Sequence, residues 1–163
     1  MKKILLLIIS ALFAIQANAQ VQEESPAITI DSLSTKLVEL QHSYDFLYCN
    51  YELYQIKTDL EQLSQDIKIT NNELTIKICF GQYDRDMYTV YSENYDARYE
   101  NYDAIKSKFE AVQKLVIIKI VTTNFTESEL NVFNACIEVI KSGMKIVEAG
   151  LKYYDKLLKI YKD

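Results

Sequence analysis

The chain has few of the residues that break helices or build turns. Its 163 residues include three glycines, one proline and no tryptophan, whereas tyrosine occurs 13 times. All-β domains need turn residues at short intervals, so this scarcity argues against β-sandwiches and β-barrels. The composition instead favours long helices with amphipathic faces, and we predict an all-α protein.

Histidine is scarcer still, and this limits the chemistry. A single histidine, His42, supports no Ser-His-Asp or Cys-His constellation, and the chain has no Gly-rich phosphate loop. The segment Glu39-Leu40-Gln41-His42 has the form of half a di-iron site, but that site needs two such motifs and further glutamates. We interpret His42 as a solvated surface residue and the acidic residues between 84 and 103 as a solvated helix face. We therefore expect no enzyme activity, no metal and no cofactor.

The three cysteines are Cys49, Cys79 and Cys136. In an oxidising compartment Cys49 and Cys79 could form a disulfide across a helical hairpin. The interpretation we favour is that all three are small buried hydrophobic residues.

Basic residues are outnumbered by acidic ones. The chain holds 18 Lys and Arg against 23 Asp and Glu, for a formal net charge of −5. Nucleic acids and anionic lipid surfaces are recognised by basic patches, so neither is expected as a partner.

The first 19 residues have the layout of a secretory signal peptide. A positive Met1–Lys3 segment precedes an apolar run over 4–15, and Ala17-Asn18-Ala19 supplies the small residues of a cleavage site. The run is shorter than the ~20 residues that span a bilayer, and we predict no transmembrane segment in the mature chain. We predict export, to the periplasm, with envelope association or secretion as alternatives. Residues 20–30 are interpreted as a flexible leader and residues 31–163 as one helical bundle domain.

A first helix is predicted to begin at Asp31 or Ser32, both good capping residues. Two apolar sets overlap in it, and we interpret the shift between them near residue 52 as a coiled-coil irregularity or a change of neighbour. The segment Thr70-Asn71-Asn72 predicts the turn that ends it. The first set comprises Leu37, Leu40, Tyr44, Leu47, Tyr51 and Tyr54, and the second comprises Leu53, Ile56, Leu60, Leu63 and Ile67.

A second helix is predicted to begin between Asn72 and Gln82 and to end before a turn at 122–125. The five residues at 93–97 recur at 100–104, a seven-residue repeat that stacks tyrosines on one face. The apolar run 117–121 is interpreted as the buried end of this helix. The predicted buried positions are Tyr88, Tyr91, Tyr95, Tyr102, Ile105, Phe109, Val112 and Val116.

The third helix has the clearest start. Thr126 and Glu129 form a T-x-x-E capping box, and Phe125 and Leu130 stand where a hydrophobic staple would pack. Ten apolar positions follow in steps of three and four up to Tyr161, which predicts a helix of about 36 residues. The three helices are expected to form a slim, antiparallel, coiled-coil-like bundle with up-down-up topology, because short turns join them.

The third helix also carries more apolar and small residues than one seam needs. Val139, Ile146 and Tyr153 form a further apolar column, and Gly143 and Gly150 form a small-residue column beside it. Glycines inside a helix cost about 1 kcal/mol each relative to alanine, which indicates a closely packed neighbour. That neighbour is either another helix of the same bundle, the reading we favour, or a partner or second copy.

Two tyrosines, Tyr48 and Tyr99, flank the tyrosine-rich seams. Tyrosine buries an apolar ring and keeps a polar tip, so it is common at binding surfaces. We take Tyr48 and Tyr99, with the columns on the third helix, as candidate interface residues.

The segment Asn124–Leu130 and the Gly-containing helix through Gly143 and Glu148 resemble exported conjugal-transfer proteins of the TrbJ type, over residues 122–150. The resemblance implies a mostly helical, signal-bearing periplasmic component of a mating channel, and it supplies no catalytic residues. We therefore expect a non-catalytic protein that acts through a protein partner or self-association, with a carrier of small apolar ligands as the alternative.

Overall fold

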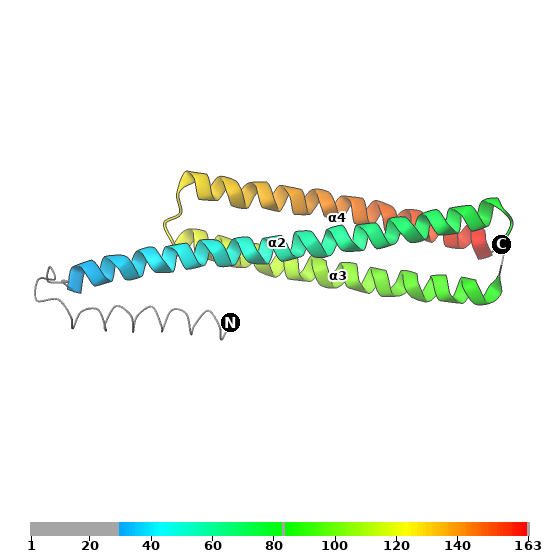
Figure 1. The fold of residues 1–163 in the computed structure, drawn as a ribbon, viewed down its shortest axis with the longest axis horizontal. Helices are drawn as coiled ribbons and strands as arrows, with labels where there is room; N and C mark the ends of the chain where they lie inside the picture. The colour runs from blue at the N-terminus through cyan, green and yellow to red at the C-terminus, as the bar shows by residue number, and fades with distance from the viewer. Residues whose placement is uncertain (1–29, 83, 163) are drawn as a thin grey trace, which may run out of the picture. The chain divides into compact units, whose positions relative to one another are not determined.

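The computed structural model describes residues 30–82 and 84–162. Within these residues the chain forms three α-helices and no strand: α2 (Ile30–Cys79), α3 (Arg85–Thr122) and α4 (Glu127–Lys162), which Figure 1 shows. The predicted all-α fold is confirmed. The predicted signal peptide (1–19) and residues 20–29 of the predicted leader lie outside the described residues.

The chain divides into two units, Met1–Leu40 and Gln41–Asp163. The described part of the first unit is the start of α2, where Leu33, Leu37 and Leu40 are exposed to solvent. The second unit is the three-helix bundle, and all the contacts described below belong to it.

Contacts between helices confirm the up-down-up topology. Asp45, early in α2, forms an ion pair with Lys119, late in α3, and Thr70 accepts a hydrogen bond from Arg98, farther from the end of α3. These pairs run in opposite directions along the two helices, so α2 and α3 are antiparallel.

Helices α2 and α4 are parallel, because contacts advance together along both. A Cβ added at Gly143 would meet Leu60, and one added at Gly150 would meet Ile67, seven residues later on each helix. The neighbour that the glycine column predicts is therefore α2 of the same chain.

The core fills the space between the three helices. Its largest fully buried side chains come from α2 and α4 and from the end of α3, and most predicted seam positions on α3 and α4 are buried. These large buried residues are Leu53, Ile56, Leu74, Val116, Phe133, Ile140, Val147 and Tyr154.

Buried tyrosines place their hydroxyl groups on polar partners. Tyr102 donates to Glu148 Oε1 at 2.6 Å, and Tyr154 donates to the backbone oxygen of Tyr91 at 2.9 Å. Burial raises the pKa of Tyr154 to about 12. These two buried tyrosines thus belong to the core, and each hydroxyl group has a polar partner, as buried polar groups require.

The turn predicted at Thr70-Asn71-Asn72 is wrong, because α2 continues to Cys79. Thr70 donates to the backbone oxygen of Asp66, and Asn71 donates to the backbone oxygen of Gly150, both at 3.0 Å. The helix penalty of such residues is at most about 0.7 kcal/mol each, whereas one net hydrogen bond contributes about 1 kcal/mol. The bond of Thr70 within α2 and the bond of Asn71 to α4 therefore override the local preference.

The actual turn lies ten residues later. Gly81 adopts a φ of +64°, the left-handed region that favours glycine. Asp84 then caps α3, accepting hydrogen bonds from the backbone N–H groups of Asp86 and Met87.

Two predicted buried faces are exposed. The first apolar set of α2 lies outside the core, with Leu47 66% and Tyr51 58% exposed. The run 117–121 is helical as predicted, but Ile117 is 61% and Val121 82% exposed. The periodicity in both cases identifies a helix, and no element of the described chain covers the face.

Candidate functional site

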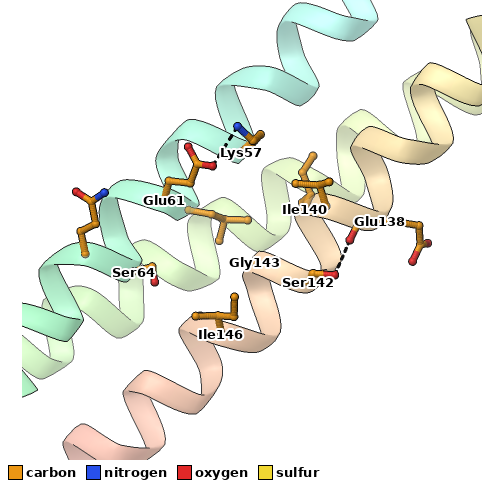
Figure 2. Close-up of a pocket in the computed structure, with 11 residues that line it drawn as sticks. Lys57, Glu61, Ser64, Glu138, Ile140, Ser142, Gly143 and Ile146 are labelled. Atoms are coloured by element: carbon orange, nitrogen blue, oxygen red, sulfur yellow. Dashed lines mark hydrogen bonds and ion pairs between the residues drawn. The ribbon is translucent and has the colours of Figure 1, made fainter.

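An open groove runs between the parallel helices α2 and α4 (Figure 2). Its main part has a volume of about 640 Å³, and a further part of about 260 Å³ continues it toward the carboxyl end of both helices. We call this surface the groove, lined by Lys57, Leu60, Glu61, Ser64, Gln65, Ile67, Lys68, Asn71, Asn72, Glu138, Val139, Ile140, Ser142, Gly143, Ile146, Val147, Gly150 and Tyr153.

The floor of the groove follows from the small residues of α4. A Cβ at Gly143 would meet Leu60 Cδ1 at 3.6 Å, an ordinary contact, whereas a Cβ at Gly150 would meet Ile67 Cγ2 at 2.9 Å. Because neither glycine has a side chain, α2 packs closely over them. Neither glycine is then available as the main contact for a partner, although both remain part of the groove lining.

The two walls differ in polarity. The α4 wall exposes three aliphatic or aromatic side chains at seven-residue spacing: Val139 at 49%, Ile146 at 61% and Tyr153 at 47%. The α2 wall is polar, with Lys57 and Glu61 paired at 3.0 Å. The groove therefore offers an apolar strip beside a polar edge, which is the arrangement that suits an amphipathic helix.

Two charged side chains of the groove lining, Lys57 and Glu138, form ion pairs with neighbours on their own helices. A hydrogen bond from Lys141 lowers the pKa of Glu138, and a hydrogen bond to Glu61 raises the pKa of Lys57. Both changes favour the charged form, so neither group is set up to exchange protons near pH 7. In the described part of the chain, no group of three His, Cys, Asp or Glu side chains could hold a metal ion.

A second exposed apolar surface lies on the outer face of α2. We call it the ridge: Tyr44, Leu47, Tyr51 and Tyr54, which are 40%, 66%, 58% and 59% exposed. Tyr44 precedes the buried Leu53 by nine residues, about 2.5 helical turns, which places the two on opposite faces of the helix. In the sequence, the same spacing continues back to the exposed Leu40 and Leu37.

The ridge is the main feature that the sequence interpretation missed. Its residues were expected to be core because they repeat in steps of three and four. One signal for this was in the sequence: the two apolar sets of α2 are offset by nine residues, which is about 2.5 helical turns. The two sets therefore lie on opposite faces, so that one faces outward when the other is buried.

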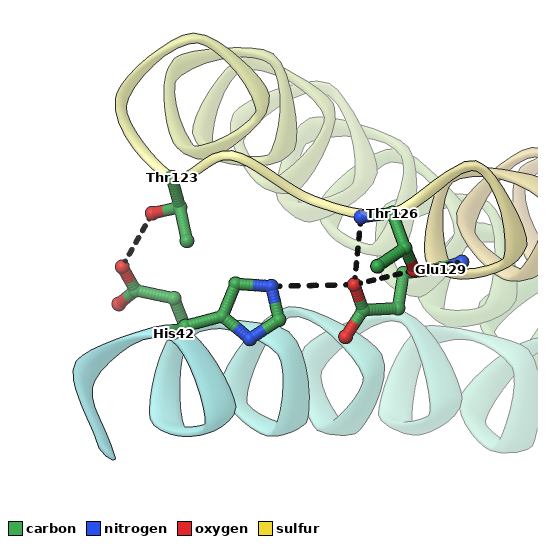
Figure 3. A network of polar contacts seen from close by, with 5 residues as sticks. His42, Thr123, Thr126 and Glu129 are labelled. Atoms are coloured by element: carbon green, nitrogen blue, oxygen red, sulfur yellow. Dashed lines mark hydrogen bonds and ion pairs between the residues drawn. The ribbon is translucent and has the colours of Figure 1, made fainter. Parts of the chain in front are cut away.

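A polar cluster joins α2 to the α3–α4 loop (Figure 3). Asp45 is 2% exposed and accepts hydrogen bonds from Lys119 and Thr123, both at 2.8 Å. Burial raises the pKa of Asp45, but the hydrogen bonds from Lys119 and Thr123 and the Lys119 charge outweigh it and hold that pKa below its usual value. The buried carboxylate thus ties the loop to the bundle.

His42 belongs to the same end of the bundle, where its side chain is partly exposed, at 28%, and also has partners that the sequence does not predict. Its Nε2 lies 3.3 Å from Glu129 Oε2, and its ring lies 5.3 Å from that of Phe125. Glu129 also accepts from the backbone N–H of Thr126 at 2.9 Å, and Thr126 Oγ1 accepts from the N–H of Glu129 at 3.3 Å (Figure 3). The predicted capping box is therefore confirmed, with His42 as an added partner.

The two flanking tyrosines have different surroundings. Tyr48 is half-buried and its ring stacks on Tyr44 of the ridge at a centroid distance of 6.0 Å. Tyr99 is exposed on α3 and packs beside Tyr95 at 6.2 Å, away from the groove lining. Of the two, only Tyr48 adjoins a candidate surface.

The possible disulfide between Cys49 and Cys79 is wrong. Both cysteines lie on α2, 30 residues and roughly 45 Å apart at 1.5 Å per residue, whereas bonded cysteines have Cα atoms within about 7 Å. All three cysteines are free, and the interpretation that all are buried holds for Cys49 but not for the exposed Cys79.

No protein-family model matches the chain, and no curated protein or solved structure matches it. None of the described helices is long and apolar enough to cross a lipid bilayer.

Proposed function

We propose that this protein is an exported, non-catalytic helical protein that acts through contacts with other proteins, and that the groove and the ridge are its contact surfaces. The observation that carries the proposal is the exposure of regularly spaced apolar side chains on two neighbouring faces. Ile146 in the groove and Leu47 on the ridge are each more than 60% exposed.

Isolated exposed apolar residues are common on proteins, but contiguous apolar patches mark interaction sites. Here the exposed residues repeat at helical spacing along their helices, which favours a helical partner over an irregular one. The polar α2 edge, with Lys57 and Glu61, supplies the rim that such interfaces have.

Export and a place in a conjugation or type IV secretion assembly are the finer part of the proposal. Export rests on the signal-peptide layout of residues 1–19, and the assembly rests on the resemblance of residues 122–150 to TrbJ-type proteins.

The test is a crosslinked pull-down of tagged protein from the cells that produce it, identified by mass spectrometry. Three forms are compared: the wild type, Ile146→Asp in the groove, and Ile117→Asp on α3 as a control. Ile117 is a matched control because it is also 61% exposed and does not line the groove. Thermal unfolding followed by circular dichroism confirms that each variant is folded.

We expect the wild type and the Ile117 variant to recover the same partner, and the Ile146 variant to lose it. Recovery of mating-channel components would support the conjugation assignment. Equal recovery by a folded Ile146 variant would contradict the role of the groove.

A second candidate function is the binding of a small apolar ligand. The main part of the groove has a volume of about 640 Å³, which falls within the range of ligand pockets, about 300–1,000 Å³. Val139 and Ile146 give it an apolar wall. Native mass spectrometry of purified protein tests this candidate: a ligand that is retained by the wild type and lost from the Ile146 variant would support it.

A further inference from the structure

The groove between α2 and α4 is the place where a fourth helix would complete the bundle. Parallel helices α2 and α4 leave their shared outer surface uncovered, and Val139, Ile146 and Tyr153 stand along it at intervals of seven residues. In helical bundles, side chains of one helix fit between those of two neighbours at this spacing. An occupant is therefore expected to be helical and to carry apolar residues in steps of three and four.

The chain itself carries such a helix. The ridge residues Tyr44, Leu47, Tyr51 and Tyr54 follow steps of three, four and three, and all are exposed. They lie on the same helix as the groove's polar wall but on a face turned away from the core, so the ridge of one copy cannot fill its own groove. It is placed to fill the groove of another copy.

We propose that a second copy of this chain occupies the groove, running antiparallel, so that the ridge of each copy lies in the groove of the other. This inference rests on the proposed function and names the partner. The pair is closed by a two-fold axis, since each copy offers both surfaces.

The positions of the two surfaces along α2 fit this arrangement. The ridge covers residues 44–54, and the α2 wall of the groove covers residues 57–72. They are adjacent, non-overlapping stretches of one helix, about 15 Å and 22 Å long at 1.5 Å per residue. With the two-fold axis near Ile56, each ridge lies beside the partner copy's groove over its whole length.

Charge does not oppose the contact. Copies of a chain with net charge −5 repel each other wherever their acidic surfaces meet. In a coiled coil the residues flanking the apolar seam set partner choice by their charges. Five of the six residues that flank the ridge are uncharged, namely Gln41, Ser43, Tyr48, Asn50 and Gln55. The sixth, Lys57, lies 5.8 Å from the centre of the Tyr54 ring and is paired with Glu61, so no acidic residue stands at these positions.

The charged residues that line the groove are also balanced. Two are basic, Lys57 and Lys68, and two are acidic, Glu61 and Glu138. A second acidic copy can therefore approach the groove without meeting a net negative wall.

Contact area favours the reciprocal pair over a single contact. Side chains of tyrosine bury about 200 Å² each, so the three ridge tyrosines, at 40–59% exposure, present roughly 300 Å². A stable protein pair buries about 800 Å² on each partner. The ridge tyrosines alone fall short of this area, so the proposed pair needs the groove of each copy as well.

The experiment is sedimentation velocity on the purified full chain over a range of concentrations. Three variants accompany the wild type: Leu47→Lys on the ridge, Ile146→Glu in the groove, and Ile117→Glu as the control on α3. Circular dichroism melting shows whether each variant is folded.

We expect the wild type and the control to be dimers, and the ridge and groove variants to dissociate at least about 30-fold more readily, the change for losing one central interface side chain. Mixing Leu47→Lys with Ile146→Glu should restore a dimer, because one lysine then faces one glutamate and the other contact is unaltered. Dissociation by the ridge variant alone would indicate ridge-to-ridge packing and overturn the inference.

A wild type that is monomeric at all concentrations would also overturn the inference. If its groove variant then loses a different protein in the pull-down, the proposed function stands and only the second copy is excluded. If its groove variant recovers the same proteins as the wild type, both proposals fail.

Discussion

The two interior glycines of α4 should respond differently to the same substitution. Replacing a glycine inside a helix with alanine stabilises the helix by about 1 kcal/mol when the methyl group has room. At Gly143 the new Cβ would meet Leu60 Cδ1 at 3.6 Å, so Gly143→Ala should gain most of that stability.

At Gly150 the new Cβ would lie 2.9 Å from Ile67 Cγ2. That methyl group belongs to a β-branched side chain, which has little rotational freedom in a helix. Overpacking of this kind costs about 1–3 kcal/mol, so Gly150→Ala should end between no net change and a loss of about 2 kcal/mol.

The assay is thermal unfolding followed by circular dichroism at 222 nm. For a domain of this size about 1 kcal/mol moves the melting temperature by ~2–4 °C, so Gly143→Ala should melt higher than the wild type and Gly150→Ala at the same temperature or lower. Adding Ile67→Leu, which removes Cγ2 and keeps the volume, should recover the stabilisation at position 150. If Gly150→Ala alone raises the melting temperature as much as Gly143→Ala, the close packing of α2 on α4 is refuted.

Three further predictions concern the buried ion pair and the cysteines. Asp45→Ala, which removes an acceptor for Lys119, should lower the free energy of unfolding in urea by about 2–3 kcal/mol. The control is Asp59→Ala, which removes an exposed partner 3.6 Å from Lys108 and should change that free energy by less than about 0.5 kcal/mol. Equal effects of the two substitutions would contradict the burial of Asp45. The pKa of Asp45 is lowered in the folded state, so the ionised carboxylate stabilises the fold fully above the ordinary Asp pKa of about 3.9. This stabilisation is lost as the pH falls below that value. Melting temperatures measured at pH 2–6 should therefore fall less steeply with acid in Asp45→Ala than in the wild type. Cys79 is exposed and should react with a thiol reagent in the folded protein. Cys49 is buried, which raises the pKa of its thiol, and it should react only when the protein unfolds. Fast labelling of both cysteines in the folded protein would contradict their placement.

Helix α4 shows what local sequence signals determine. Its start is fixed by the reciprocal hydrogen bonds of Thr126 and Glu129, and its buried face is fixed by an unbroken three-four spacing. Both signals act within a few residues, so both can be recognised in the sequence without knowledge of the fold. The same holds for the central part of α3, where Ile105, Phe109 and Val112 are buried as expected.

Helix α2 shows where such signals stop. Spacing shows that the face with Leu47 and Tyr51 is apolar, but it does not show which helix covers that face. The covering element can be distant in the sequence or belong to another molecule. The missed continuation through Thr70 and Asn71 has a related cause, since the bond from Asn71 to the backbone of Gly150 joins residues 79 positions apart. The groove could be anticipated only as the glycine and apolar columns of α4, because its other wall comes from α2.

The most direct test of the central claim, that the protein makes its contacts through the groove and the ridge, is photo-crosslinking in the cells that produce it. A photoreactive phenylalanine analogue replaces Leu47, Ile146 or, as the control, Ile117, which are all 61–66% exposed. The account predicts crosslinked products of defined mass from positions 47 and 146 and none from position 117. Products of equal yield from all three positions, or from position 117 alone, would contradict it.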